Sequence, residues 1–298
     1  MRLVRASGIL RAAGADHVFE ARSMSTTVPA QRAAVLPPLK TTGPLRRRIA
    51  GQSVMEEVLA LRATTPPQGA LARLLGAPIL PESARSWYSG ALGERAVGRL
   101  LSRLGPEWTV LHAVPVGERS SDIDHVVIGP GGVFTINTKH HPGARIWTAG
   151  STFMVNRTKV PYIRNSVHEA ARAGEFLSSA VRQRVIAEAV IVVVGSDRIT
   201  QRDVHESVTV LTPDRLLRWL TKRPVSLSPG QISLLSAAAA QPTTWSRRPQ
   251  ALADPADIVA RFEALVRAVD QARRRRLGWL LAAPALLLSS AAGVLPPF

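Results

Sequence analysis

Apolar residues in the middle of the chain recur first with a helical period and then in short strand-like runs. From residue 90 to 104 they fall every three or four positions, which predicts an amphipathic helix that ends at Gly105 and Pro106. Strand-like runs follow at 108–116, 122–128 and 133–138. The Gly-Pro-Gly-Gly sequence at 129–132 predicts a tight turn, so the second and third strands should form a hairpin.

The same alternation continues to about residue 220. Further strands are predicted at 145–148, 152–155, 186–194 and 208–211. One helix is predicted to begin at Asn165 and Ser166, where Ser166 and Glu169 have capping-box spacing, and another covers 214–220. This order of elements is typical of an α/β fold, and we expect a mixed central sheet flanked by helices.

Composition divides the chain into four segments. Residues 1–80 are rich in Ala, Arg, Pro and Thr with one helical stretch at 53–63, and we expect a mostly disordered basic arm. Residues 81–222 hold the α/β domain, and residues 223–276 form a helical region. Residues 277–298 form an apolar tail.

The tail follows a long helix that is predicted to begin at Asp254 and Pro255. Four arginines, residues 273–276, precede 277–295, where no residue is charged. As a helix this stretch is about 28 Å long, close to the roughly 30 Å of a bilayer core, which predicts a membrane-spanning helix. Because Pro284 and many small residues weaken insertion, a helix packed on the protein or lying at the membrane interface is the alternative. A spanning helix would keep the arginines and the folded domain on the cytoplasmic side.

Composition also narrows the chemistry. The chain has no cysteine, which excludes disulfides, zinc–thiolate sites and cysteine nucleophiles, so a metal must be held by oxygen or imidazole. The net charge of +17 favours polyanions, either nucleic acid or an anionic membrane surface, but an Arg-rich surface that only aids solubility fits equally well. Neither a Gly-x-Ser-x-Gly elbow nor a Gly-x-x-x-x-Gly-Lys loop occurs, so α/β serine hydrolases and P-loop NTPases fit poorly.

Two acids lie close together on the first strand of the predicted hairpin. Asp122 and Asp124 are two positions apart, so their side chains face the same way, while Ile123 faces the opposite side. Adjacent carboxylates repel each other unless a positive group lies between them, and hard oxygen ligands suit Mg²⁺ or Mn²⁺. The pair therefore predicts a metal site, with a pair of surface acids bound to arginines as the structural alternative.

The returning strand brings two more polar side chains to the same place. Asn137 and Lys139 alternate in the same way, and Glu94 on the preceding helix can reach them from across the sheet. A lysine here can orient a water molecule and stabilise charge on a phosphate, while a metal polarises the phosphoryl oxygen. Glu94 taken singly is more typical of a surface acid. Together the residues match metal-assisted phosphodiester hydrolysis.

These motifs resemble those of the NERD domain, the nuclease-related domain placed in the PD-(D/E)XK superfamily. The resemblance covers about residues 87–219 and implies a restriction-endonuclease-like fold. It also implies that Glu94 is the helix acid, Asp124 the strand acid and main metal ligand, and Lys139 the motif lysine. The chain departs from the family at Asn137, which stands two residues before the lysine in place of an acid. An amide oxygen can still touch a metal, but it brings no charge.

Three consequences of Asn137 stay open. Asp122 can restore the carboxylate count, or His140 or His141 can contribute a nitrogen ligand. Alternatively, the domain binds nucleic acid without cutting it. The predicted substrate contacts are His140, Arg145 and Arg164.

Three functions from different classes follow. The first is an Mg²⁺- or Mn²⁺-dependent nuclease that acts on DNA and uses Lys139 to aid the attacking water. Its predicted metal ligands are Glu94, Asp122, Asp124 and Asn137. The second is a nucleic-acid-binding module without turnover, and the third is a membrane-tethered adaptor whose basic segments bind lipid headgroups or partners. Metal-dependent cleavage distinguishes the first, and binding that falls steeply with salt supports the second.

Overall fold

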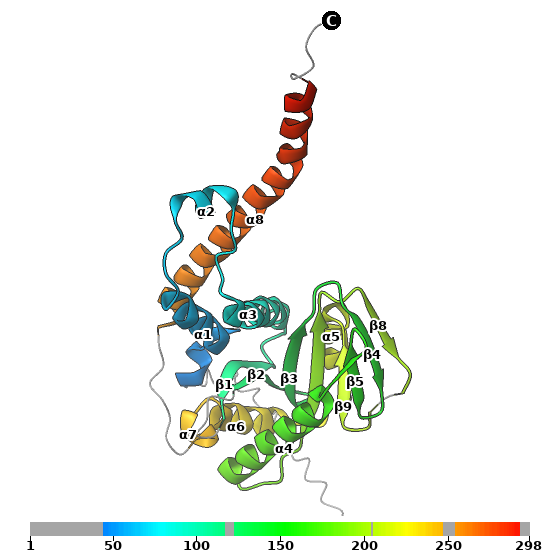
Figure 1. Ribbon diagram of the computed structural model, residues 1–298. Helices are drawn as coiled ribbons and strands as arrows, with labels where there is room; N and C mark the ends of the chain where they lie inside the picture. The colour runs from blue at the N-terminus through cyan, green and yellow to red at the C-terminus, as the bar shows by residue number, and fades with distance from the viewer. Residues whose placement is uncertain (1–43, 117–121, 204, 247–253, 293–298) are drawn as a thin grey trace, which may run out of the picture. The chain divides into compact units, whose positions relative to one another are not determined.

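A mixed sheet forms the centre of the protein. The computed structural model describes residues 44–116, 122–203, 205–246 and 254–292, the last ten by their backbone alone (Figure 1). The sheet has the order β1-β2-β3-β7-β9. Its strands are β1 (Thr109–Pro115), β2 (Asp122–Gly129), β3 (Gly132–His140), β7 (Ala187–Val194) and β9 (Val208–Leu211). Antiparallel pairing joins β1, β2 and β3, whereas β7 and β9 run parallel to β3, so the predicted mixed sheet is confirmed.

The predicted hairpin is formed by β2 and β3. The two strands pair from Gly129 opposite Gly132 to His125 opposite Ile136. A Cβ atom on Gly129 would lie 2.1 Å from a ring carbon of Trp108, and Gly132 has a φ of 132°, so both positions require glycine. This turn fixes the register that sets the polar side chains of β2 beside those of β3.

A second sheet has the order β6-β5-β4-β8. Its strands are β6 (Thr158–Val160), β5 (Thr152–Val155), β4 (Arg145–Ala149) and β8 (Arg198–Gln201). The predicted pair at 145–148 and 152–155 is confirmed as β4 and β5. Neither β6 nor β8 was predicted, because both are short and polar, and β8 becomes a strand only by pairing in parallel with β4.

Helices cover both faces of the main sheet. They are α3 (Glu82–Leu101), α4 (Tyr162–Val181), α5 (Pro213–Thr221), α6 (Pro229–Ala239) and α7 (Pro242–Trp245). On one face, α4, α6 and α7 pack on apolar residues that include Val126 and Ile128. On the other, α3 and α5 pack on Val127, Phe134 and Ile136. The alternation of β2 and β3 thus separates two apolar cores, and the flanking helices are those expected of an α/β fold.

The helix predicted to begin at Asn165 and Ser166 begins earlier. Helix α4 starts at Tyr162 with Pro161 at its N-cap, so Ser166 lies inside the helix and is buried. The capping box predicted between Ser166 and Glu169 is therefore wrong. A capping box with the same spacing does form at the start of α6, between Ser228 and Gln231.

The N-terminal part of the described chain packs against α3. It contains η1 (Pro44–Arg47), α1 (Gln52–Ala63) and α2 (Ala70–Leu75), and the helix predicted at 53–63 is confirmed as α1. Met55 and Val58 of α1 are buried with Ala91 of α3 and Phe262 of α8 (Pro255–Ala292). In Figure 1, α1 accordingly lies beside both α3 and α8. The expected disorder of residues 1–80 does not extend over these helices, and residues 1–43 lie outside the described residues.

Among the described residues, no helix is long and apolar enough to cross a membrane. The span predicted at 277–295 is therefore not found there, and its side chains after residue 282 lie outside the description. Trp279 within this stretch and Arg275 just before it contact α2 instead. The Trp279 indole Nε1 donates a hydrogen bond of 3.0 Å to the Leu74 carbonyl, and Arg275 donates one of 3.1 Å to the Arg73 carbonyl.

Candidate functional site

Three elements bring the predicted acids and the lysine together. Glu94 is buried on α3, Asp124 lies near the start of β2, and Lys139 lies near the end of β3. The paired residues of β2 and β3 run only as far as His125 opposite Ile136. At the next position of β2, the Asp124 Oδ2 accepts a hydrogen bond of 2.6 Å from the backbone N–H of Thr138. This bond fixes Asp124 against the strand that carries Lys139.

Burial raises the pKa values of both acids, and repulsion from neighbouring carboxylates adds to this effect. For Glu94, burial raises the pKa well above its usual value and the Asp124 carboxylate raises it further, while Lys139 opposes both effects. For Asp124, burial also raises the pKa, against the lowering effects of Lys139 and the Thr138 N–H. The two carboxylates are thus electrostatic neighbours with Lys139 as their nearby cation, which is the arrangement of a site that binds positive charge.

A third acid, Glu169 of α4, belongs to the same cluster. The Asn137 amide Nδ2 donates a hydrogen bond of 3.1 Å to Glu169 Oε2. Burial, followed by repulsion from Asp124, raises the pKa of Glu169 to about 8. Asn137 is 8% exposed, and within the described part of the chain both its Oδ1 and the Glu169 Oε1 are buried without a hydrogen-bond partner.

Sequence reasoning missed Glu169 because it treated the residue as a helix cap. A signal was present, since polar residues recur at helical spacing along this part of α4. They are Asn165, His168, Glu169 and Arg172. All four line one cleft, so this polar stripe faces the site.

The cleft beside Asn137 has a volume of about 450 Å³ and a cationic wall. Its lining includes Lys139, Arg164 and Arg172. The Lys139 Nζ lies 4.8 Å from the centre of the Tyr162 ring, which holds the ammonium group by a cation–π contact. Of the three predicted substrate contacts, Arg164 lies in this cleft.

The other two predicted substrate contacts lie elsewhere. His140 Nδ1 is 2.8 Å from the Ser89 carbonyl, a bond that ties the end of β3 to α3. Arg145 lines a separate cavity on the second sheet together with Trp147, Arg157 and Arg198. The predicted alternative ligand His141 is 3.2 Å, through Nε2, from the hydroxyl of Tyr162.

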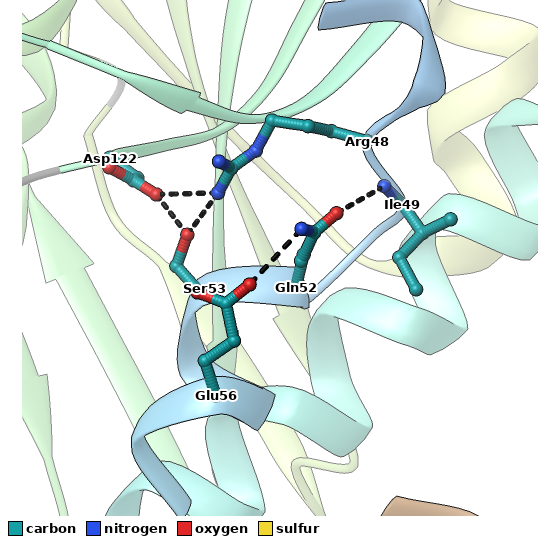
Figure 2. Close-up of polar contacts among 6 residues, drawn as sticks. All are labelled: Arg48, Ile49, Gln52, Ser53, Glu56 and Asp122. Atoms are coloured by element: carbon teal, nitrogen blue, oxygen red, sulfur yellow. Dashed lines mark hydrogen bonds and ion pairs between the residues drawn. The ribbon is translucent and has the colours of Figure 1, made fainter. Parts of the chain in front are cut away.

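Asp122 is engaged by the N-terminal segment. Figure 2 shows its carboxylate in a triangle with Arg48 and Ser53, in which Arg48 lies 3.2 Å away and the Ser53 hydroxyl donates a second hydrogen bond. Burial raises the pKa of Asp122, and Ser53 and Arg48 lower it. Asp122 and Asp124 lie on the same side of β2, because side chains alternate along a strand. Asp122, however, forms an ion pair with Arg48, which is the arrangement expected if the acid is structural and not a metal ligand.

The buried His125 of β2 pairs with the partly buried His112 of β1. His125 and His112 approach each other through their Nδ1 atoms at 2.8 Å, and His125 Nε2 is 3.4 Å from the hydroxyl of Thr138. Burial lowers the pKa of His112 to about 4 and that of His125 well below its usual value, so both rings are neutral. His125 is thus a packed, hydrogen-bonded residue.

The oxygen atoms of this site can hold a hard cation only if the Asn137 amide oxygen is one of the ligands. Among the described residues, no three side chains of His, Asp or Glu lie close enough together to hold a metal ion by themselves. The Asn137 Oδ1, however, is buried and unpaired beside carboxylates that repel one another. Oxygen donors of this kind suit Mg²⁺ or Mn²⁺ and not a thiolate-seeking metal.

Comparison with known proteins identifies the kind of domain that contains these residues. The family model described as nuclease-related domain, NERD, matches residues 89–194. An uncharacterized protein of Bacillus anthracis is 36% identical over 92 residues, which cover 27% of this chain and 43% of the relative. The match thus spans less than half of that relative's length, and no solved structure matches the chain. Residues 89–194, which contain Glu94, Asp124 and Lys139, are therefore a nuclease-related domain of the NERD family.

Proposed function

We propose that this domain hydrolyses phosphodiester bonds of DNA with the help of a divalent cation. The observation that carries the proposal is that three separate elements place Asp124 and Lys139 near the buried Glu94, where Asp124 raises and Lys139 lowers the pKa of Glu94. Buried like charges are costly to a fold, so their convergence beside a lysine supports a ligand-binding role more than a structural one.

The proposed cation ligands include the carboxylates of Glu94 and Asp124 and the amide oxygen of Asn137. The two acids supply negative charge, and the unpaired Asn137 Oδ1 supplies a neutral oxygen. When bound, Mg²⁺ or Mn²⁺ supplies Lewis-acid polarisation of the phosphoryl oxygens. The fixed Asp124–Thr138 hydrogen bond keeps the strand acid in place.

Lys139 and the cationic wall of the cleft act on the phosphate itself. The Lys139 ammonium is held over Tyr162 next to the acids, where it can stabilise negative charge that develops on a phosphate oxygen. Arg164 and Arg172 line the same cleft and can bind neighbouring backbone phosphates. Recognition through phosphates implies cutting with little base preference.

Cleavage of labelled single- and double-stranded DNA by the full chain tests the proposal. We expect cutting with Mg²⁺ or Mn²⁺ and none with EDTA, and a loss of about 100-fold or more in Asp124→Asn and in Lys139→Met. Lys222→Met, which removes an exposed lysine after α5, serves as the matched control and should cut normally. Absence of cutting by the wild-type chain with every divalent metal would sink the proposal.

A nucleic-acid-binding module without turnover is the second candidate. It is favoured by the neutral Asn137 in a cleft whose wall is cationic. In that case the wild-type chain would bind DNA with an affinity that falls steeply as salt increases, and Arg164→Ala would reduce the salt dependence. Asp124→Asn would leave this binding intact.

A further inference from the structure

We propose that Glu169 of α4 is a ligand of the divalent cation and that it acts together with the Asn137 amide oxygen. The inference rests on the proposed nuclease function. It adds a ligand from α4, which lies outside the hairpin of β2 and β3. The charge that Asn137 lacks would thus come from a residue 32 positions further along the chain.

The hydrogen bond between the two side chains orients their free atoms. One N–H of the Asn137 Nδ2 donates to Glu169 Oε2 at 3.1 Å, which leaves the amide's acceptor Oδ1 without a partner among the described residues. One carboxylate oxygen of Glu169, Oε1, is left over in the same way. The pair therefore leaves two buried acceptor oxygens, one from an amide and one from a carboxyl group, and oxygen atoms of this kind are the ligands of a hard cation.

Both free oxygens are buried, which a purely structural pair would avoid. Asn137 is 92% buried (8% exposed), and neither Asn137 Oδ1 nor Glu169 Oε1 has a hydrogen-bond partner among the described residues. A buried acceptor without a donor costs free energy unless something satisfies it. Both residues line the same cleft, so a cation that enters the cleft can satisfy both.

The surroundings of Glu169 favour a cation over a water molecule. Asp124 is its strongest like-charged neighbour, and Lys139 and Arg172 are the cations that act on it. Helix α4 packs on β3 and β7, so Glu169 is held on a rigid element against the strand that carries Asn137. Asp124 and Glu169 both raise the pKa of Glu94 as well, so the three carboxyl groups share one region, in which Lys139 and Arg172 are the neighbouring cations.

Binding of Mn²⁺ to the full chain, followed by electron paramagnetic resonance of the free ion, tests the inference without any cleavage. We expect Glu169→Gln to weaken Mn²⁺ binding by about tenfold or more, because it removes a charged ligand. The exchange variant Asn137→Asp/Glu169→Gln keeps one acid and one amide in contact and should regain most of the affinity. Glu175→Gln removes an exposed acid from the same helix and should bind as the wild type does.

Thermal unfolding of each metal-free variant is measured beside the Mn²⁺ titration. A loss of Mn²⁺ binding counts only for variants that are folded at the temperature of the titration. Wild-type affinity in Glu169→Gln, with DNA cutting by the wild-type chain intact, would overturn the inference and leave the nuclease standing. An equal loss in Glu169→Gln and Glu175→Gln would overturn it as well, since the effect would be one of net charge. If the wild type neither binds Mn²⁺ nor cuts DNA, the nuclease proposal fails and this inference fails with it.

Discussion

At the scale of single residues, the site is a set of carboxyl groups kept away from water. Burial raises the pKa of Glu94, Asp124 and Glu169, and repulsion from Asp124 raises the pKa of the other two further. The pKa values of His112 and His125 shift in the opposite direction, because loss of contact with water there favours the neutral imidazole. These two sets of groups give the metal-free protein opposite pH responses.

The stability of the metal-free protein should fall between pH 6.5 and 8. The folded chain holds a proton on Glu169 up to a pKa of about 8, whereas the unfolded chain loses it near 4.5, so the folded state binds more protons across this range and is destabilised as pH rises. The neutral histidines reduce stability only below about pH 6.5, outside the range. We expect a fall of roughly 1–2 kcal/mol in the free energy of unfolding by urea.

Glu169→Gln should flatten this pH dependence, because an amide does not titrate. Saturating Mn²⁺ should reverse the slope for the wild type, since the cation competes with protons for the same oxygens. Identical slopes in the wild type and in Glu169→Gln would show that Glu169 does not carry the proton.

At the scale of elements, the site depends on how closely α3 approaches β3. A Cβ atom on Gly93 would lie 2.7 Å from His140 Cβ and 3.3 Å from Thr138 Cγ2, so glycine allows this contact. Glu94 is the next residue of the helix. The position of the helix acid relative to Asp124 is therefore set by a glycine beside it.

Gly93→Ala should push α3 away from β3 and move Glu94. We expect a loss of about 1–3 kcal/mol in the free energy of unfolding, as for overpacking of a core, together with weaker metal-dependent cleavage. Gly90→Ala is the matched control on the same helix, because a Cβ there would meet nothing within 4 Å. It should leave cleavage unchanged and raise stability slightly through helix propensity. Equal stability of the two variants by urea unfolding would contradict this account of the contact.

At the scale of the whole molecule, the nuclease-related domain is completed by residues outside its matched range of 89–194. Leu45 of η1 is buried in the core under α4 and α6, and Leu216 and Leu220 of α5 are buried in the core under α3. Beyond these cores, α1 and α8 cover the outer side of α3. The contact of Arg48 and Ser53 with Asp122 links the N-terminal segment directly to β2 (Figure 2).

A fragment limited to residues 89–194 should fail to fold cooperatively. This fragment lacks strand β9 of the main sheet and helix α5, which packs on that sheet. It also exposes the apolar residues of α3 that α1 and α8 bury in the full chain. Residues 44–282 should unfold in one cooperative transition. Circular dichroism during heating measures both, and a sharp transition in the short fragment would show that the flanking elements are dispensable.

Local patterns in the sequence determined the main elements and the centre of the candidate site. Alternation along β2 and β3 and the glycine turn between them set Asp124, Asn137 and Lys139 on one side of the hairpin, and helical periodicity identified α3 with Glu94. These features depend on neighbouring residues, so the sequence carries them directly. The tertiary structure alone decided the partners that lie far apart in the chain. Glu169 meets Asn137, Arg48 meets Asp122, and β8 pairs with β4 because packing of whole elements brings them together, and no local pattern encodes such contacts.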